Sequence, residues 1–321
     1  MSFSSFTRRR FFRLLPAGVL AGCRQENSAP PLRFPKVPWK VTSTTHFTAD
    51  LVRAIGGEAV QSQCFLPPGV SPHNFMPVAT DLRKFHTSDM VVTHGLGLED
   101  RWPENFEALA SDGVHVVSAT SAIPPERILR PAGPAGPPDP HVWTHPELAV
   151  FMVSAVEAAL KDNGVMPKLA DYFAARAHKL RMEFQDAMRF GAGRAGELTS
   201  EDRFLLTTHD TMQYFASAFG LEARALAPSG GKLPDTLPAE LREWIRGHGV
   251  KSLFREPATD VIALRKLMEE VRVDPDHVIY TLALPAPGTS AVVSLKTYDA
   301  GTAPGSLWNN LDLILSTLPV D

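Results

Sequence analysis

One long helical pattern constrains the fold of this chain more than any other feature. Apolar residues recur mostly at steps of three or four between residues 166 and about 190, among them Leu169, Phe173 and Leu180. A helix of about 25 residues is roughly 37 Å long at 1.5 Å per residue. Such a helix is long enough to cross a whole protein as a central spine.

Short apolar runs alternate with helical patterns before and after this helix. The predicted strands span residues 40–45, 59–66, 90–93 and 115–118 before it, and 204–208, 222–227, 252–255, 277–283 and 291–297 after it. The predicted helices between them span residues 49–55, 78–85, 99–110, 146–161, 211–219, 238–247, 261–271 and 306–317. Strands that alternate with helices of this length pair in parallel through crossover helices. The predicted fold class is therefore α/β, with two lobes, each with a mainly parallel sheet flanked by helices.

This alternation gives the predicted domain bounds. An amino-terminal α/β lobe spans residues 40–162, the linking helix spans 163–193, and a carboxyl-terminal α/β lobe spans 194–321. A glycine-rich stretch at 191–196 is expected to end the linking helix, because glycine is the usual residue just past a helix end. A proline-rich loop at 123–140 interrupts the first lobe and contains no histidine.

The first 22 residues have the features of an export signal. Arg8, Arg9 and Arg10 precede a short apolar run at 14–21, which is the twin-arginine type of bacterial signal. The run is shorter than the roughly 20 apolar residues that a membrane-spanning helix needs. The sequence Leu-Ala-Gly-Cys that ends at Cys23 resembles a lipobox, which predicts cleavage before Cys23 and a lipid on its thiol. We therefore predict an exported, membrane-anchored lipoprotein that faces the periplasm or the cell exterior, with a proline-rich tether at 23–39.

Charge and cysteine content argue against a general nucleic-acid binder and against a fold held together by disulfides. Four arginines and no acidic residues lie in residues 1–22, so the remaining chain has 28 basic and 35 acidic residues and a formal charge of about −7. A general nucleic-acid binder needs a basic face, so no nucleic-acid partner is expected. With Cys23 lipidated, Cys64 has no partner for a disulfide and is interpreted as a small buried apolar residue. We expect a monomer.

Four residues in loops are predicted to bind one metal ion: His73, His141, His209 and Asp299. His73 lies in the loop 67–81, which four prolines stiffen because each ring fixes its own φ and disfavours helix for the preceding residue. In open parallel sheets, loops after the carboxyl ends of strands form the binding crevice. Three imidazoles and a carboxylate form a nitrogen-rich site that suits Zn²⁺, with Zn–N distances of about 2.0 to 2.1 Å.

Several motifs together resemble one known family. They are Pro-Pro-Gly-Val-Ser-Pro-His-Asn-Phe-Met-Pro at 67–77, Gly-Leu-Gly-Leu-Glu at 95–99, Asp-Pro-His-Val-Trp at 139–143 and His-Asp-Thr-Met-Gln-Tyr-Phe at 209–215. The sequence is similar to the zinc- and manganese-binding substrate-binding lipoproteins of ABC importers, over nearly all of residues 40–320. The resemblance implies two α/β lobes joined by one long rigid helix, with a metal ion held between these lobes by His73, His141, His209 and Asp299. It also implies delivery of that ion to a membrane permease and its ATPase, with no catalytic role.

Some details of the site remain open at this stage. Glu256 is an alternative to Asp299 as the acidic ligand, because the chain is longer than the family pattern at 273–290. His145, four residues after His141, is either a partner of the site, an alternative ligand or a solvated histidine. Zinc is the expected metal, with manganese or ferrous iron next, because the Irving–Williams order favours zinc over both.

Two other functions are consistent with the same ligands. A metal-dependent hydrolase also uses three histidines and an acid, but it needs a positioned general base, and no His-Glu-x-x-His sequence supplies one. A surface adhesin or metal scavenger that acts without a transporter keeps both the lipid anchor and the metal site.

Overall fold

The computed structural model of the protein describes residues 34–162, 167–228 and 231–318. The predicted export signal, Cys23 and the tether up to residue 33 lie outside the described residues. The described part begins with Phe34, which packs its ring edge-on against Tyr172 at a centroid distance of 5.2 Å. None of the helices in the described part is long and apolar enough to span a membrane.

The amino-terminal lobe is built on a four-stranded parallel sheet with the strand order β2-β1-β3-β4. Its elements are β1 (Trp39–Ser43), α1 (His46–Gly56), β2 (Val60–Cys64), α2 (Ala79–His86), β3 (Met90–Thr93), α3 (Phe106–Ser111) and β4 (His115–Ser118). A capping box starts α1, in which the side chains of Thr45 and Thr48 each accept a hydrogen bond from the other residue's backbone N–H.

The carboxyl-terminal lobe repeats this arrangement with the strand order β6-β5-β7-β8, again all parallel. Its elements are β5 (Phe204–His209), α6 (Gln213–Phe219), β6 (Glu222–Ala227), α7 (Ala239–Gly247), β7 (Ser252–Arg255), α8 (Val261–Glu269) and β8 (Asp274–Val278). An antiparallel hairpin of β9 (Ser290–Val293) and β10 (Lys296–Asp299) and the helix α9 (Ala303–Thr317) follow. The predicted fold class, two α/β lobes joined by a long helix, is confirmed.

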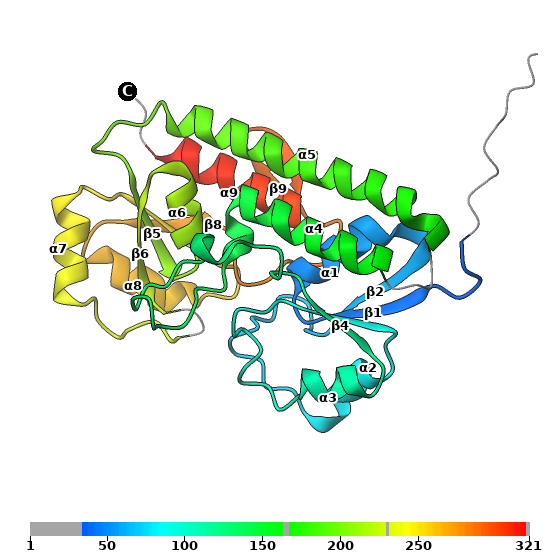
Figure 1. Ribbon diagram of the computed structural model, residues 1–321. Coiled ribbons are helices and arrows are strands. Elements are labelled where there is room, and N and C mark those ends of the chain that lie inside the picture. Colours follow the sequence, from blue (N-terminus) through cyan, green and yellow to red (C-terminus); the bar gives the residue numbers. More distant parts are fainter. Residues whose placement is uncertain (1–33, 163–166, 229–230, 319–321) are drawn as a thin grey trace, which may run out of the picture. The chain divides into compact units, whose positions relative to one another are not determined.

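Three helices lie side by side along the two lobes (Figure 1). The long helix α5 (Ala170–Ala195) packs against both α4 (Pro146–Asp162) and α9. One continuous apolar core includes Val41 and Phe47 from the first lobe, Phe184 from α5, and Leu205 and Leu311 from the second. The long helix is therefore a shared part of the core.

Each sheet also has a second, smaller core on its other face. In β3, Met90 and Val92 belong to the shared core, whereas Val91 packs with Phe65 and Phe85 in a separate cluster. The same alternation occurs in the second lobe, where neighbouring residues of β5 face opposite cores. Alternation with a period of two is what a strand covered on both faces requires.

The long helix ends inside the glycine-rich stretch 191–196, and Gly196 is its C-cap residue. It continues through Gly191 and Gly193 to Ala195. Gly191 is buried where α5 meets α6 and α9, and a Cβ there would lie 2.4 Å from the ring of Phe219 and 2.8 Å from Leu311. This glycine allows close packing of three helices, so its role here differs from that of a helix end.

Three elements differ from the predicted ones. The helix predicted at 99–110 begins only at Phe106, because the Glu99 carboxylate accepts hydrogen bonds from loop backbone and Asn105 caps the helix. The single strand predicted at 291–297 is instead the hairpin β9–β10, which turns at Ser294 and Leu295 with φ of 48° and 67°. The strand predicted at 277–283 is β8, which begins and ends earlier, at Asp274 and Val278.

Candidate metal centre

The three histidines that the sequence singled out all lie at the carboxyl ends of parallel strands. His73 is in the loop after β2, His141 ends the long loop after β4, and His209 is the last residue of β5. Strand ends of the same sense meet at one edge of a sheet, where binding sites form in this class of fold. The topology thus explains how residues far apart in the sequence approach one another.

His73 and His141 meet directly. Their Nε2 atoms are 3.0 Å apart, and their ring centroids are 5.1 Å apart. Two zinc–nitrogen bonds of about 2.0 to 2.1 Å at a tetrahedral angle place the two nitrogens about 3.3 Å apart. The separation in the structure is within a few tenths of an ångström of that value, so this pair fits a shared metal ion with little movement.

His73 is held in its neutral form. Burial, followed by the charges of nearby His141 and His94, lowers the pKa of His73 to about 3, and Asp139 opposes this only in part. A metal binds the unprotonated imidazole, so a histidine that is already neutral at pH 7 loses no proton on binding.

Asp139 orients the second histidine of the pair. Its Oδ1 lies 2.6 Å from Nδ1 of His141 and accepts a hydrogen bond of 2.9 Å from the backbone N–H of the same residue. Both residues are buried. With the proton on Nδ1 donated to the carboxylate, the lone pair of His141 is on Nε2, which faces His73. This carboxylate–histidine arrangement is the one that orients metal-binding histidines in proteins.

Asp139→Asn is expected to weaken zinc binding by about 10- to 100-fold, the usual cost of losing an outer partner of a metal ligand. The substitution keeps the shape of the side chain but removes the charge that fixes the tautomer of His141. Competition titration of the purified protein against a zinc chelator measures the change. Asp112→Asn, at an exposed carboxylate after α3, is the control. Equal affinities for the two variants would show that Asp139 does not act on the metal.

A buried network holds the His141 loop against the first sheet. His94 is fully buried, and its Nε2–H donates to the Pro140 carbonyl at 2.8 Å. The Glu99 carboxylate accepts from the backbone N–H of His94 and of Gly95, and from the hydroxyl of Thr44. Burial raises the pKa of Glu99 and lowers that of His94 to about 4. Sequence reasoning assigned no role to either residue, because the bonds connect loops after different strands.

His209 has a carboxylate partner of its own, Glu256. The Nδ1 of His209 is 2.9 Å from Oε2 of Glu256, and its Nε2 is 3.2 Å from the carbonyl oxygen of Gly231. Burial lowers the pKa of His209, but the hydrogen bond and charge of Glu256 and the Gly231 carbonyl raise it above its usual value. Glu256 is buried and also accepts from the hydroxyls of Thr208 and Thr281. Glu256, the alternative acidic ligand, therefore serves in this structure as the hydrogen-bond partner of His209.

The structure does not bring His209 into contact with the other two histidines. Its charge is near enough to lower the pKa of His73. Even so, within residues 34–162, 167–228 and 231–318 no group of three His, Cys, Asp or Glu side chains is close enough to hold a metal ion. The structure therefore shows a histidine pair from one lobe and a third histidine, from the other lobe, that does not contact the pair.

Asp299 lies apart from these histidines. Its Oδ1 accepts hydrogen bonds of 3.0 Å from the backbone N–H of Gly288 and of Gly301, at the end of the hairpin. Its charge helps to raise the pKa of Asp50, which is buried beside the start of α9. The hairpin turn at Ser294 and Leu295 leads the chain back toward α9, and the sequence prediction of one continuous strand could not include that reversal.

His145 is buried, which corrects its interpretation as a solvated histidine. Its Nδ1 accepts a hydrogen bond of 3.2 Å from the backbone N–H of Glu147, in the first turn of α4. Burial, followed by the charge of Arg127, lowers the pKa of His145 to about 4, so it stays a neutral acceptor. In the structure it satisfies one of the free N–H groups at the start of a helix.

Two hydrogen bonds fasten the His141 segment to the carboxyl-terminal lobe. Nε1–H of Trp143 donates to the Thr281 carbonyl at 2.9 Å, and the hydroxyl of Tyr214 donates to the Asp139 carbonyl at 2.9 Å. The same hydroxyl accepts from the backbone N–H of Leu129 at 2.8 Å. Trp143 also stacks on Phe47 with a centroid distance of 4.8 Å. The aromatic residues of the two motifs thus connect the lobes beside the site.

Comparison with known proteins decides the family. Residues 41–300 match the model of the family described as "zinc-uptake complex component A, periplasmic". The chain belongs to this family. This zinc-uptake component A family is one of transport components and not of enzymes, so the metallohydrolase alternative is set aside.

Curated relatives and solved structures agree with this membership. The manganese-binding lipoprotein MntA of Bacillus subtilis is 26% identical over 283 residues, which cover 87% of this chain and 89% of the relative. The iron-binding protein YfeA of Yersinia pestis is 25% identical, with 77% and 78% covered. The structure of the periplasmic zinc-binding protein TroA of Treponema pallidum is 24% identical and covers 87% of this chain and 99% of that one with a TM-score of 0.74, which supports the shared fold.

Proposed function

We propose that this member of the zinc-uptake component A family captures a divalent transition metal between its two lobes outside the cytoplasm. It then delivers the ion to the permease of an ABC importer. The observation that carries the proposal is the His73–His141 pair, with Nε2 atoms 3.0 Å apart, one neutral by burial and the other oriented by Asp139. His209, oriented by Glu256 from the second lobe, is the third ligand in this proposal.

Zinc is the proposed metal. The relatives named above are described as manganese-binding, iron-binding and zinc-binding, so the family alone leaves the ion undecided. Three imidazole nitrogens suit zinc better than manganese, which prefers carboxylate and carbonyl oxygens. Asp299 stays a proposed fourth ligand only if the hairpin end moves, since its carboxylate holds backbone N–H groups at Gly288 and Gly301.

Metal binding across the lobes has a mechanical consequence. An ion bound by His73 and His141 from one lobe and by His209 from the other binds the closed arrangement of the lobes more tightly than the open one. This difference in affinity shifts the population toward the closed arrangement. The Nε2 of His209, now at the Gly231 carbonyl, has to be released for this step. We propose that the permease recognises the closed arrangement of a monomeric, lipid-anchored protein attached through Cys23.

Titration of the metal-free protein with zinc and with manganese tests the choice of ion. One zinc ion per chain, bound at least tenfold more tightly than manganese in competition, is the expected result, in keeping with the Irving–Williams order. Zinc that binds more weakly than manganese would contradict the choice of metal. Absence of binding by either would contradict the site.

Zinc uptake by cells tests delivery to a transporter. Cells that lack this protein are expected to take up zinc more slowly at low external concentration, and the defect should be reversed by the wild-type chain but not by a variant with His73→Ala. Equal uptake with and without the protein would favour the adhesin or scavenger alternative, which keeps the metal site and needs no permease.

A further inference from the structure

A cavity of about 700 Å³ lies beside His209, between the His73 loop and the carboxyl-terminal lobe. Its walls come from Gly69, Ser71 and Asn74 of that loop and from the segments that follow β6, β7 and β8. A water molecule occupies roughly 30 Å³, whereas small-molecule sites in proteins measure about 300 to 1,000 Å³. The space is therefore far larger than a metal ion and its water need.

Three polar side chains in this cavity have no partner among the described residues. The Oγ1 of Thr259 is buried without a hydrogen bond. The Lys232 ammonium and the Asn74 amide are exposed and also make no hydrogen bond or ion pair within the part of the chain that the structure describes. An ammonium, an amide and a hydroxyl are all hydrogen-bond donors, which is the set that binds a carboxylate.

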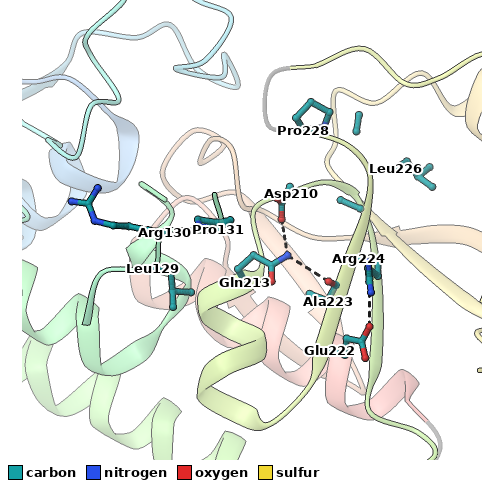
Figure 2. A pocket seen from close by; sticks show the side chains of 12 residues that line it. Leu129, Arg130, Pro131, Asp210, Gln213, Glu222, Ala223, Arg224, Leu226 and Pro228 are labelled. Carbon is teal, nitrogen blue, oxygen red and sulfur yellow. Dashed lines mark hydrogen bonds and ion pairs between the residues drawn. The ribbon is translucent and has the colours of Figure 1, made fainter. Parts of the chain in front are cut away.

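A second cavity, of about 920 Å³ along β6, differs in this respect (Figure 2). Its polar side chains bond to one another: Gln213 donates to Asp210 at 2.8 Å, and Arg224 pairs with Glu222 at 3.2 Å. Arg130 donates to the Gly136 carbonyl. Groups that satisfy each other offer little to a ligand, so the cavity beside His209 is the better candidate for one.

The metal centre itself leaves a coordination position for such a ligand. Zinc takes four ligands and can expand to five, and the three histidines supply three of them. Asp299 does not fill the remaining positions in this structure, because its carboxylate accepts from the backbone N–H groups of Gly288 and Gly301. The two carboxylates next to the histidines are used elsewhere, Asp139 by His141 and Glu256 by His209, Thr208 and Thr281. The segment after β8 that borders the cavity presents Thr281 and Leu282, neither of which is an acid.

We propose that the ion is bound together with a small carboxylate chelator, an α-amino acid or an α-hydroxy acid. Its donor atoms complete the coordination of the metal, and its free carboxylate binds Lys232 and Asn74. Leu233, Leu282 and Pro257 provide apolar contact for the rest of the molecule. This inference rests on the proposed function, because it makes the chelated ion the cargo of the same site.

Equilibrium dialysis of the full chain with L-histidine or citrate, with and without zinc, tests the inference. We expect about one chelator molecule per chain to be retained only when zinc is present. The chelator that is retained should also raise the affinity of the protein for zinc by about 5- to 150-fold over its affinity without chelator. This is the usual range of coupling between two bound ligands.

The variant Lys232→Ala separates the chelator from the ion. Loss of a charge-assisted hydrogen bond is expected to weaken chelator retention roughly 10- to 100-fold, while the affinity for zinc alone stays the same. Lys251→Ala is the matched control, since Lys251 is exposed and precedes β7, at the end of the strand opposite the cavity. Equal chelator retention by the two variants would overturn the assignment of Lys232.

The remaining outcomes separate this inference from the proposed function. Zinc bound tightly while both chelators merely strip it from the protein would overturn the inference and leave the proposed function intact. Chelator retained equally without zinc would overturn the inference as well. No zinc bound, alone or with chelator, would overturn the proposed function.

Discussion

Replacing His73 by alanine is expected to lower zinc affinity by more than about 100-fold. Loss of a residue that only hydrogen-bonds to a metal ligand costs roughly 10- to 100-fold, and loss of the ligand itself should cost more. His73 is half of the pair whose Nε2 atoms are 3.0 Å apart, and burial keeps it neutral and available to the metal. His209→Ala is expected to have a comparable effect, because it removes the ligand from the other lobe. Competition titration against chelators of graded affinity measures both changes.

The control for these variants is His178→Ala, on an exposed face of α5. It should leave both zinc affinity and urea unfolding unchanged. The His73→Ala variant should also unfold at nearly the wild-type urea concentration, because within the described part of the chain the His73 side chain makes a hydrogen bond to His141 alone. A His73→Ala variant with full zinc affinity would remove this residue from the site.

The second large effect is expected in the long helix. Phe184 is 1% exposed and belongs to the core that both lobes share. Phe184→Ala should lower the free energy of unfolding by about 3 to 5 kcal/mol, the usual cost of an aromatic truncation in a core. Urea unfolding followed by circular dichroism gives this value.

Met182 on the same helix provides the matched control. It is 38% exposed, so Met182→Ala should change the free energy of unfolding by no more than about 0.5 kcal/mol. Similar losses for the two variants would mean that α5 is not anchored through its buried face, and would contradict the view of the helix as part of a shared core.

The sequence predicted the elements best where local signals were strong. The bounds of β3, β4, β6 and β7 agree with the predicted strands. Each of β3 and β4 contains a pair of valines, and a proline follows β6 and β7 within two residues, which are local signals for a strand and for its end. The parallel pairing followed from the alternation of strands and helices. The meeting of His73 and His141 followed from the rule that binding loops lie at strand ends.

Errors arose where a distant contact overrides the local pattern. The residues after Glu99 have a helical composition, but its carboxylate bonds to the backbone of His94 and Gly95 and so remains in a loop. His145 has an ordinary polar sequence context, yet it is buried at the start of α4. Single-sequence patterns contain no information about such partners, because the contacts depend on the assembled fold.

The identity of the acidic ligand stays a prediction. Asp299 was chosen because it precedes the last helix at about the spacing of the family that the sequence resembles. The hairpin β9–β10 places it instead against the backbone of Gly288 and Gly301. A turn formed by Ser294 and Leu295, both with positive φ, lacks the Asn-Gly signal that identifies a tight hairpin in a sequence.

Gly191, packed between α5, α6 and α9, restricts how the sequences of this family can change. A side chain at Gly191 needs space that Phe219 and Leu311 now fill, at 2.4 and 2.8 Å from the Cβ position. Close contacts of this kind couple the effects of substitutions. Among relatives with a larger residue at this position, we expect smaller residues at one or both of the other two, so that the three positions vary together during evolution.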